Sequence, residues 1–170
     1  IGEVMAYELS RQLHYRDTEI QTPLGLKKCT EISDPLVICS ILRAGLPLHT
    51  GFLNVFDGAE NGFVSAYRHH PNNDDYFDIK VEYQAIADIN GKTLVLVDPM
   101  LATGQSLVAV YNRLMERGTP KQIHIAVVIA AATKVVARSA AATGAIPIAR
   151  AVIGRKAIAP AMTAPTAATR

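Results

Sequence analysis

An acidic residue followed by a loop of small and hydroxyl-bearing residues is the stretch of the sequence best suited to chemistry. Asp98 is followed closely by Ala102, Thr103, Gly104 and Ser106. Small side chains let backbone N–H groups approach an anion, and the hydroxyls add further donors. A carboxylate placed before such a loop can accept hydrogen bonds from a sugar diol. These residues predict a sugar-phosphate site in which the loop holds the phosphate and Asp98 holds the ribose.

The segments on either side of this loop predict a strand before it and a helix after it. Residues 94–97 are four apolar residues without alternation, which is typical of a parallel strand buried on both faces. Apolar residues then recur at helical spacing over 107–115. On the local pattern alone, an ordinary turn whose Ser and Thr cap the helix remains an alternative. The loop matches neither a Walker loop nor Gly-x-Gly-x-x-Gly.

Two arginines follow further predicted strands. Residues 36–42 form a second apolar run that ends in Arg43, and Pro47 opens a helix that we expect to reach Phe56. Residues 62–67 predict a third strand, which ends in Arg68. A guanidinium donates two hydrogen bonds at once to a phosphate. Both positions therefore suit a phosphate ligand, although a lone Arg after a strand is also a common surface residue.

The remaining elements alternate strand and helix patterns through residue 131. Residues 1–13 predict a helix, residues 19–22 and 26–29 a hairpin, and residues 122–130 a buried strand. This alternation indicates parallel βαβ units in one α/β domain spanning 1–170. The helix carries an apolar stripe that we expect in the core, with a subunit contact as the alternative. The stripe consists of Ile1, Val4, Met5, Leu9 and Leu13.

A polar segment interrupts the pattern after the third strand. His69 and His70 precede Asp74 and Asp75, and alternating apolar residues follow over 77–83. We expect a hairpin over the sheet edge. A metal site is the alternative, but adjacent residues of extended backbone point in opposite directions, which favours a solvated loop.

Composition narrows the class of protein. The 170 residues are 49% hydrophobic and contain no apolar run long enough to cross a membrane. Residues 117–170 hold 8 Lys and Arg and no acidic residue, but they lack the aromatic residues that stack on bases, so we expect no nucleic-acid partner. Cys29 and Cys39 make no disulfide framework, and reduced thiols in the cytoplasm are the simplest interpretation.

Three motifs together resemble the uracil phosphoribosyltransferase family. They are Asp-Pro-Met-Leu-Ala-Thr-Gly at 98–104, Ile-Leu-Arg-Ala-Gly at 41–45 and Tyr-Arg at 67–68, and the resemblance covers about residues 1–131. It implies the type I phosphoribosyltransferase core, a parallel sheet flanked by helices with a flexible loop and a small hood. The implied reaction joins uracil to 5-phosphoribosyl 1-diphosphate and gives UMP and diphosphate, usually with Mg²⁺. A homo-oligomer, commonly a dimer, is also implied.

The resemblance assigns roles to individual residues. Arg43 and Arg68 would hold the diphosphate, and with Asp98 they are the expected catalytic residues. The sugar phosphate would be lined by Asp98, Pro99, Met100, Leu101, Ala102, Thr103, Gly104, Gln105 and Ser106. The chemistry expected is a direct displacement at C1, in which the arginines stabilise the departing charge rather than act as acid or base.

The sequence also departs from the family pattern. Gln105 stands where the family often has a small residue. The hood segment of the type Tyr-x-x-Pro-Gly-Leu-Gly-Asp is absent from residues 131–170, which contain 15 alanines and no Asp, Glu, Tyr or Phe. Two alternatives therefore stay open: a regulatory protein that binds phosphoribosyl diphosphate without catalysis, or a phosphoribosyltransferase for another base.

Overall fold

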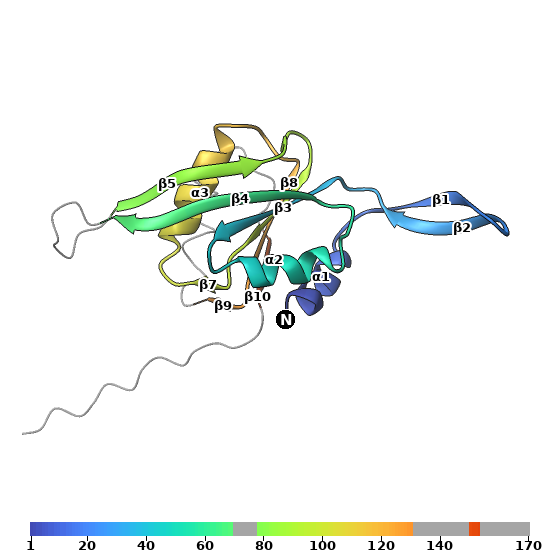
Figure 1. The fold of residues 1–170 in the computed structure, drawn as a ribbon, viewed down its shortest axis with the longest axis horizontal. Coiled ribbons are helices and arrows are strands. Elements are labelled where there is room, and N and C mark those ends of the chain that lie inside the picture. The colour runs from blue at the N-terminus through green and yellow to red at the C-terminus, as the bar shows by residue number, and fades with distance from the viewer. Residues whose placement is uncertain (70–77, 131–149, 154–170) are drawn as a thin grey trace, which may run out of the picture.

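The computed structural model describes residues 1–69, 78–130 and 150–153, so residues 70–77, including the metal-site alternative, and nearly all of the expected hood lie outside the described residues. Three helices and ten strands occur within the described part of the chain (Figure 1). In order they are α1 (Gly2–Ser10), β1 (Tyr15–Thr22), β2 (Gly25–Ile32), β3 (Leu36–Leu42), α2 (Leu46–Leu53), β4 (Glu60–His69), β5 (Asp78–Ile86), β6 (Thr93–Val97), β7 (Met100–Leu101), α3 (Gln105–Met115), β8 (Gln122–Val127), β9 (Ile129–Ala130) and β10 (Arg150–Ile153). No helix among them is both long and apolar enough to cross a membrane.

The central sheet has the strand order β10-β8-β6-β3-β4-β5. All neighbouring pairs are parallel except β4 and β5, which pair as an antiparallel hairpin at one edge. The predicted α/β class with a largely parallel sheet is confirmed. The hairpin predicted after the third strand is also present, although its tip falls in the undescribed segment.

Helices cover both faces of this sheet, which explains the unbroken apolar runs. Alternate residues of β6 enter different clusters: Leu94 and Leu96 pack with α3, whereas Val95 and Val97 pack with α1 and α2. Every residue of β6 is buried. A strand buried on both faces has no solvent side on which polar residues could alternate.

Helix α1 is rotated relative to the predicted stripe. Met5, Leu9 and Leu13 are buried as expected, but Ile1 is 77% exposed and Val4 is 66% exposed. The core assignment of Ile1 and Val4 is therefore wrong. In the alternative, a subunit contact through Val4, Met5 and Leu9, the side chains of Met5 and Leu9 are buried in the core of this chain and cannot take part, whereas Val4 is exposed.

A contact between two glycines accounts for this rotation. A methyl group placed on Gly51 of α2 would lie 2.8 Å from the Cα of Gly2 and 3.0 Å from the backbone nitrogen of Glu3. The backbones of α1 and α2 therefore touch, and the face of α1 that carries Gly2 must turn inward. Hydrophobic periodicity does not register this contact, since glycine contributes no apolar side chain.

Replacing Gly51 by alanine is expected to destabilise the fold, because the new methyl group would meet backbone rather than a flexible side chain. We expect the free energy of unfolding to fall by about 2 kcal/mol, and the melting temperature to fall by about 4–8 °C. Thermal unfolding measures the shift. Gly58→Ala is the control, because a methyl group there meets nothing within 4 Å. Equal melting temperatures for the two variants would contradict the packing argument.

Two other boundaries differ from expectation. Helix α2 ends at Leu53, not at Phe56, and a turn follows in which Phe56 donates to the carbonyl of Phe52 at 2.9 Å. The single strand predicted over 122–130 is divided into β8 and β9. The break occurs because the N–H groups of Val128 and Ile129 both donate to the carbonyl oxygen of Pro99.

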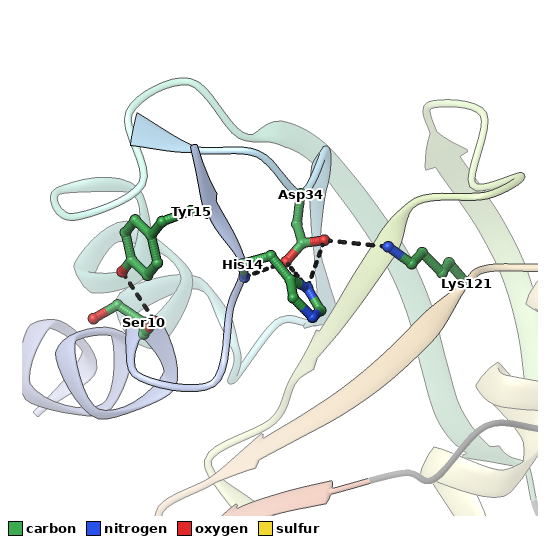
Figure 2. A network of polar contacts seen from close by, with 5 residues as sticks. All are labelled: Ser10, His14, Tyr15, Asp34 and Lys121. Carbon is green, nitrogen blue, oxygen red and sulfur yellow. Dashed lines mark hydrogen bonds and ion pairs between the residues drawn. The ribbon is translucent and has the colours of Figure 1, made fainter. Parts of the chain in front are cut away.

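Strands β1 and β2 form the predicted hairpin, and it projects from the sheet as a separate arm (Figure 1). At its base, Asp34 anchors the arm to the core (Figure 2). The buried carboxylate of Asp34 accepts from the backbone N–H of His14 at 2.7 Å, and it lies 3.0 Å from His14 Nδ1 and 3.6 Å from Lys121 Nζ. Lys121 precedes β8, so this cluster joins the arm to the central sheet.

The surroundings of Asp34 act on its pKa in opposite directions. Burial raises the pKa, but the hydrogen bonds from His14 and the charges of His14 and Lys121 together outweigh burial and lower it. A carboxyl group with a lowered pKa stabilises the fold when ionised. This stabilisation is present above the ordinary pKa of an aspartate and is lost as the pH falls through the lowered value.

Candidate active site

Three predicted site segments meet at the carboxyl ends of three neighbouring strands of the sheet. Arg43 follows β3, Arg68 lies near the carboxyl end of β4, and Asp98 follows β6. These strands are neighbours in the order β4-β3-β6, and they are parallel. The chain passes from β3 to β4 on one side and returns to β6 on the other. Ligands of open α/β sheets bind at such a change of direction.

Asp98 is held by its backbone, and its side chain keeps most of its acceptor capacity. Its N–H donates to the carbonyl of Ala126 at 3.1 Å, and its carboxylate accepts a long hydrogen bond of 3.4 Å from the N–H of Met100. Burial raises the pKa of Asp98, an effect that the Met100 N–H partly offsets. No ion pair to Asp98 occurs within the described residues. The carboxylate is therefore available to sugar hydroxyls.

The loop after Asp98 is fixed at both ends. At its start, β7 pairs with β9, and the Pro99 carbonyl accepts the two N–H groups that follow β8. At its end, Gly104 is the N-cap of α3 with a φ of 80°, a left-handed conformation that favours glycine. The first N–H groups of α3 have no partner within the helix and face the loop. A helix start of this kind binds anions.

A cavity of about 160 Å³ lies along this loop. Pro99 is the one predicted loop residue that does not line it. Leu101 lines it although the residue is only 5% exposed and packs in the core. Gln105 Oε1 lies 3.4 Å from Thr103 Oγ1. The lining residues are Asp98, Met100, Leu101, Ala102, Thr103, Gly104, Gln105, Ser106 and Leu107.

Larger cavities lie elsewhere: one of about 480 Å³ on the β1–β2 arm and one of about 460 Å³ at its base. Each cavity contains an ion pair: Arg16 lies 2.7 Å from Glu31 in one, and Lys28 lies 3.8 Å from Glu19 in the other. Neither cavity combines a carboxylate with a helix start. Chemistry therefore favours the smaller cavity beside Asp98 as the substrate site.

The turn that carries Arg43 is tightly packed. The peptide bond between Leu42 and Arg43 is cis, and the Arg43 side chain is exposed. A methyl group on Gly45 would lie 2.3 Å from Ser40 Oγ and 2.7 Å from the carbonyl oxygen of Ile41, so only glycine fits at this position. Arg43 was predicted from the sequence, but the packing of Ser40 against Gly45 beneath it was not. The only sign of this packing in the sequence is Ser40, a hydroxyl residue within an apolar strand.

Arg68 is described through its backbone, which pairs with Ile79 of β5. The structure places this position on the strand next to the Arg43 turn. The neighbouring Tyr67 donates its hydroxyl to Glu82 across the same pair of strands, and this hydrogen bond raises the pKa of Tyr67.

The site offers few ligands for a metal ion by itself. Across residues 1–69, 78–130 and 150–153, no group of three His, Cys, Asp or Glu side chains is placed to hold one. Mg²⁺ needs no such group when it binds through substrate phosphates, because one or two carboxylates then suffice. Asp98 supplies one carboxylate at the loop, so the residues present fit an Mg²⁺ ion that arrives with a phosphorylated substrate.

Comparisons with known proteins point to one family. Residues 1–167 match a family model described as uracil phosphoribosyltransferase. A uracil phosphoribosyltransferase of Porphyromonas gingivalis is 51% identical over 130 residues, which are 76% of this chain and 60% of that protein. One of Methanothermobacter thermautotrophicus is 38% identical over 122 residues, covering 71% of this chain and 55% of that protein. The chain thus spans little more than half the length of these relatives.

Solved structures show a similar fold. The structure of the AQ2163 protein from Aquifex aeolicus has a TM-score of 0.73 at 26% identity and covers 90% of this chain and 70% of its own. A hypoxanthine phosphoribosyltransferase from Staphylococcus aureus has a TM-score of 0.56 at 14% identity, over 90% of this chain and 71% of its own. The second similarity concerns the fold alone.

Proposed function

Because the chain belongs to the uracil phosphoribosyltransferase family, we propose that it transfers the phosphoribosyl group of 5-phosphoribosyl 1-diphosphate to uracil, giving UMP and diphosphate. One observation carries the proposal. A carboxylate, an anion-binding helix start and an arginine turn meet at the carboxyl ends of neighbouring parallel strands. A sugar that bears a phosphate at one end and a diphosphate at the other has this same distribution of groups.

Each part of the site has a role in this proposal. The loop and the start of α3 bind the 5-phosphate through N–H groups and the hydroxyls of Thr103 and Ser106. Asp98 accepts hydrogen bonds from the ribose diol, which its half-buried and weakly bonded carboxylate favours. Arg43 and Arg68 bind the diphosphate.

The reaction is a displacement at C1 of the ribose. The bond from N1 of uracil to C1 forms as the bond from C1 to the diphosphate oxygen breaks, and the N1 proton passes to solvent water. Positive charge develops on the ring and negative charge on the leaving group, as in sugar hydrolysis. Guanidinium groups stabilise the second charge, and the Asp98 carboxylate lies on the side of the first. No side-chain nucleophile takes part.

We include Mg²⁺ in the proposal as a cofactor that Asp98 would help to hold. When bound, it supplies positive charge to the phosphate oxygens. The chain's own residues orient the sugar, because the loop is held by the β7–β9 pairing and by Gly104.

Binding and a panel of bases test the proposed function. Calorimetry with phosphoribosyl diphosphate and Mg²⁺ should show binding, and nucleotide formation should occur with uracil rather than hypoxanthine or orotate. Binding without any nucleotide would instead support a regulatory protein, and product from another base would change the substrate.

We further propose that the protein is a homodimer of the cytoplasm. The arm supports dimerisation, because its apolar side chains lie outside the core: Leu24 is 101% exposed, Leu26 70% and Ile20 50%. The cytoplasm is supported by two free thiols, Cys29 and Cys39. Burial raises the pKa of Cys39 to about 12, so this thiol stays protonated.

Leu24→Asp is expected to weaken such a dimer without affecting folding, because the side chain makes no contact in its own chain. Loss of a leucine buried in the interface should raise the dissociation constant of the dimer by about 10–100-fold. Sedimentation velocity measures the change, with Lys27→Asp on the same arm as the control. Equal dimerisation of the Leu24 variant and wild type would show that the arm tip is not in the interface.

A further inference from the structure

Ser40 is a buried hydroxyl that the mechanism above does not use. It lies in β3 with 0% exposure, and its Oγ has no hydrogen-bond partner within the described residues. The strand is otherwise apolar on either side of it. A buried hydroxyl without a partner is unfavourable by comparison with alanine. The presence of such an unpaired hydroxyl in a central strand therefore needs an explanation.

Its position suggests that explanation. Ser40 pairs with Val97, the residue before Asp98, and its Oγ faces the Cα of Gly45 so closely that a methyl group there would lie 2.3 Å away. It therefore lies directly beneath the Arg43 turn, between the proposed diphosphate and ribose positions. The N–H of Gly45 is bound to the carbonyl of Ile41, so the turn and the hydroxyl touch without a hydrogen bond.

We propose that Ser40 is a positioning residue for diphosphate binding, whose hydroxyl pairs with the backbone of the Arg43–Gly45 turn when diphosphate binding shifts that turn. This inference rests on the proposed function. A hydroxyl that is unpaired in one arrangement of the turn and paired in the other favours the second arrangement. It would thereby add to the affinity for the diphosphate without touching it.

A structural explanation competes with this one. His49 of α2 packs on Phe63 at 4.9 Å, and Phe63 is the residue paired with Ser40 in β4. His49 Nε2 lies 2.8 Å from Asn61 Oδ1, while its Nδ1 has no partner in the described part of the chain. A water shared by Ser40 Oγ and His49 Nδ1 would make Ser40 stabilise the fold. Replacing Ser40 would then lower stability instead of affinity.

The variant Ser40→Ala separates the two, because it removes the hydroxyl with little change of shape. We expect its melting temperature to equal or exceed that of wild type, and its affinity for phosphoribosyl diphosphate in calorimetry to be about tenfold weaker. The KM for uracil should not change. Thr93→Val is the matched control. Thr93 is another fully buried hydroxyl without a partner, but it lies at the opposite end of β6 from the site.

Calorimetry without uracil keeps this inference separable from the proposed function. A lower melting temperature for Ser40→Ala would overturn the positioning role in favour of a structural one. Equal affinities of wild type and Ser40→Ala would overturn it as well, while leaving the proposed function intact. Failure of wild type to bind phosphoribosyl diphosphate would overturn both. Weaker binding in Ser40→Ala, but not in Thr93→Val, would support it.

Discussion

Arg43→Ala is expected to lower kcat/KM for UMP formation by about 100–1,000-fold, because a positioned donor is lost from the charge that develops on the diphosphate. The fold should be unaffected, since the Arg43 side chain is exposed and makes no ion pair in the described part of the structure. Steady-state kinetics with varied phosphoribosyl diphosphate measure the loss, and thermal unfolding verifies the fold.

Two further variants sharpen this test. Arg43→Lys keeps the charge but loses the planar fork, so its activity should lie between those of alanine and wild type. Arg113→Ala is the control, because Arg113 is an exposed arginine of α3 that is paired with Glu116. A turnover rate for Arg43→Ala equal to that of Arg113→Ala would remove Arg43 from the mechanism.

Asp98→Asn is expected to impair function while it stabilises the fold. Loss of the carboxylate should lower kcat/KM by about 100-fold, since a charged acceptor for the ribose hydroxyls is replaced by an amide. Burial raises the pKa of Asp98, so the ionised group destabilises the folded chain. The variant should therefore unfold at higher urea concentrations than wild type at neutral pH.

The stability difference between Asp98→Asn and wild type should depend on pH. A raised pKa means that the folded state binds the proton more tightly than the unfolded state, so wild type loses stability as the pH rises through that pKa. The advantage of Asp98→Asn should vanish at acidic pH, where Asp98 is protonated. Asp88→Asn should behave oppositely, because hydrogen bonds from Asn90 lower the pKa of Asp88. Greater stability of wild type than Asp98→Asn at neutral pH would contradict the account.

Much of the sheet could be predicted, because a strand that is buried on both faces has an unbroken run of apolar residues in the sequence. The runs that became β3 and β6 are apolar without alternation, and the residues after them, Arg43 and Asp98, mark the edge where the strands end. The type of each proposed site residue also follows from chemistry, since carboxylates accept from diols and guanidinium groups bind phosphates.

The features that were missed depend on contacts between distant backbones. The inward face of α1 follows from Gly2 touching Gly51, and the division of the last predicted strand follows from the Pro99 carbonyl. Likewise, the positioning role proposed for Ser40 depends on the packing of Gly45 against it. None of these contacts changes a hydrophobic pattern, so reading along the chain cannot find them.

Formation of UMP by the purified 170-residue chain is the most direct test of the proposed phosphoribosyl transfer. The protein is incubated with phosphoribosyl diphosphate, uracil and Mg²⁺, and UMP and diphosphate are quantified together, with Arg43→Ala run in parallel. We expect equal amounts of the two products from wild type and a loss of both in the variant. Binding of phosphoribosyl diphosphate by wild type with no UMP formed would contradict it.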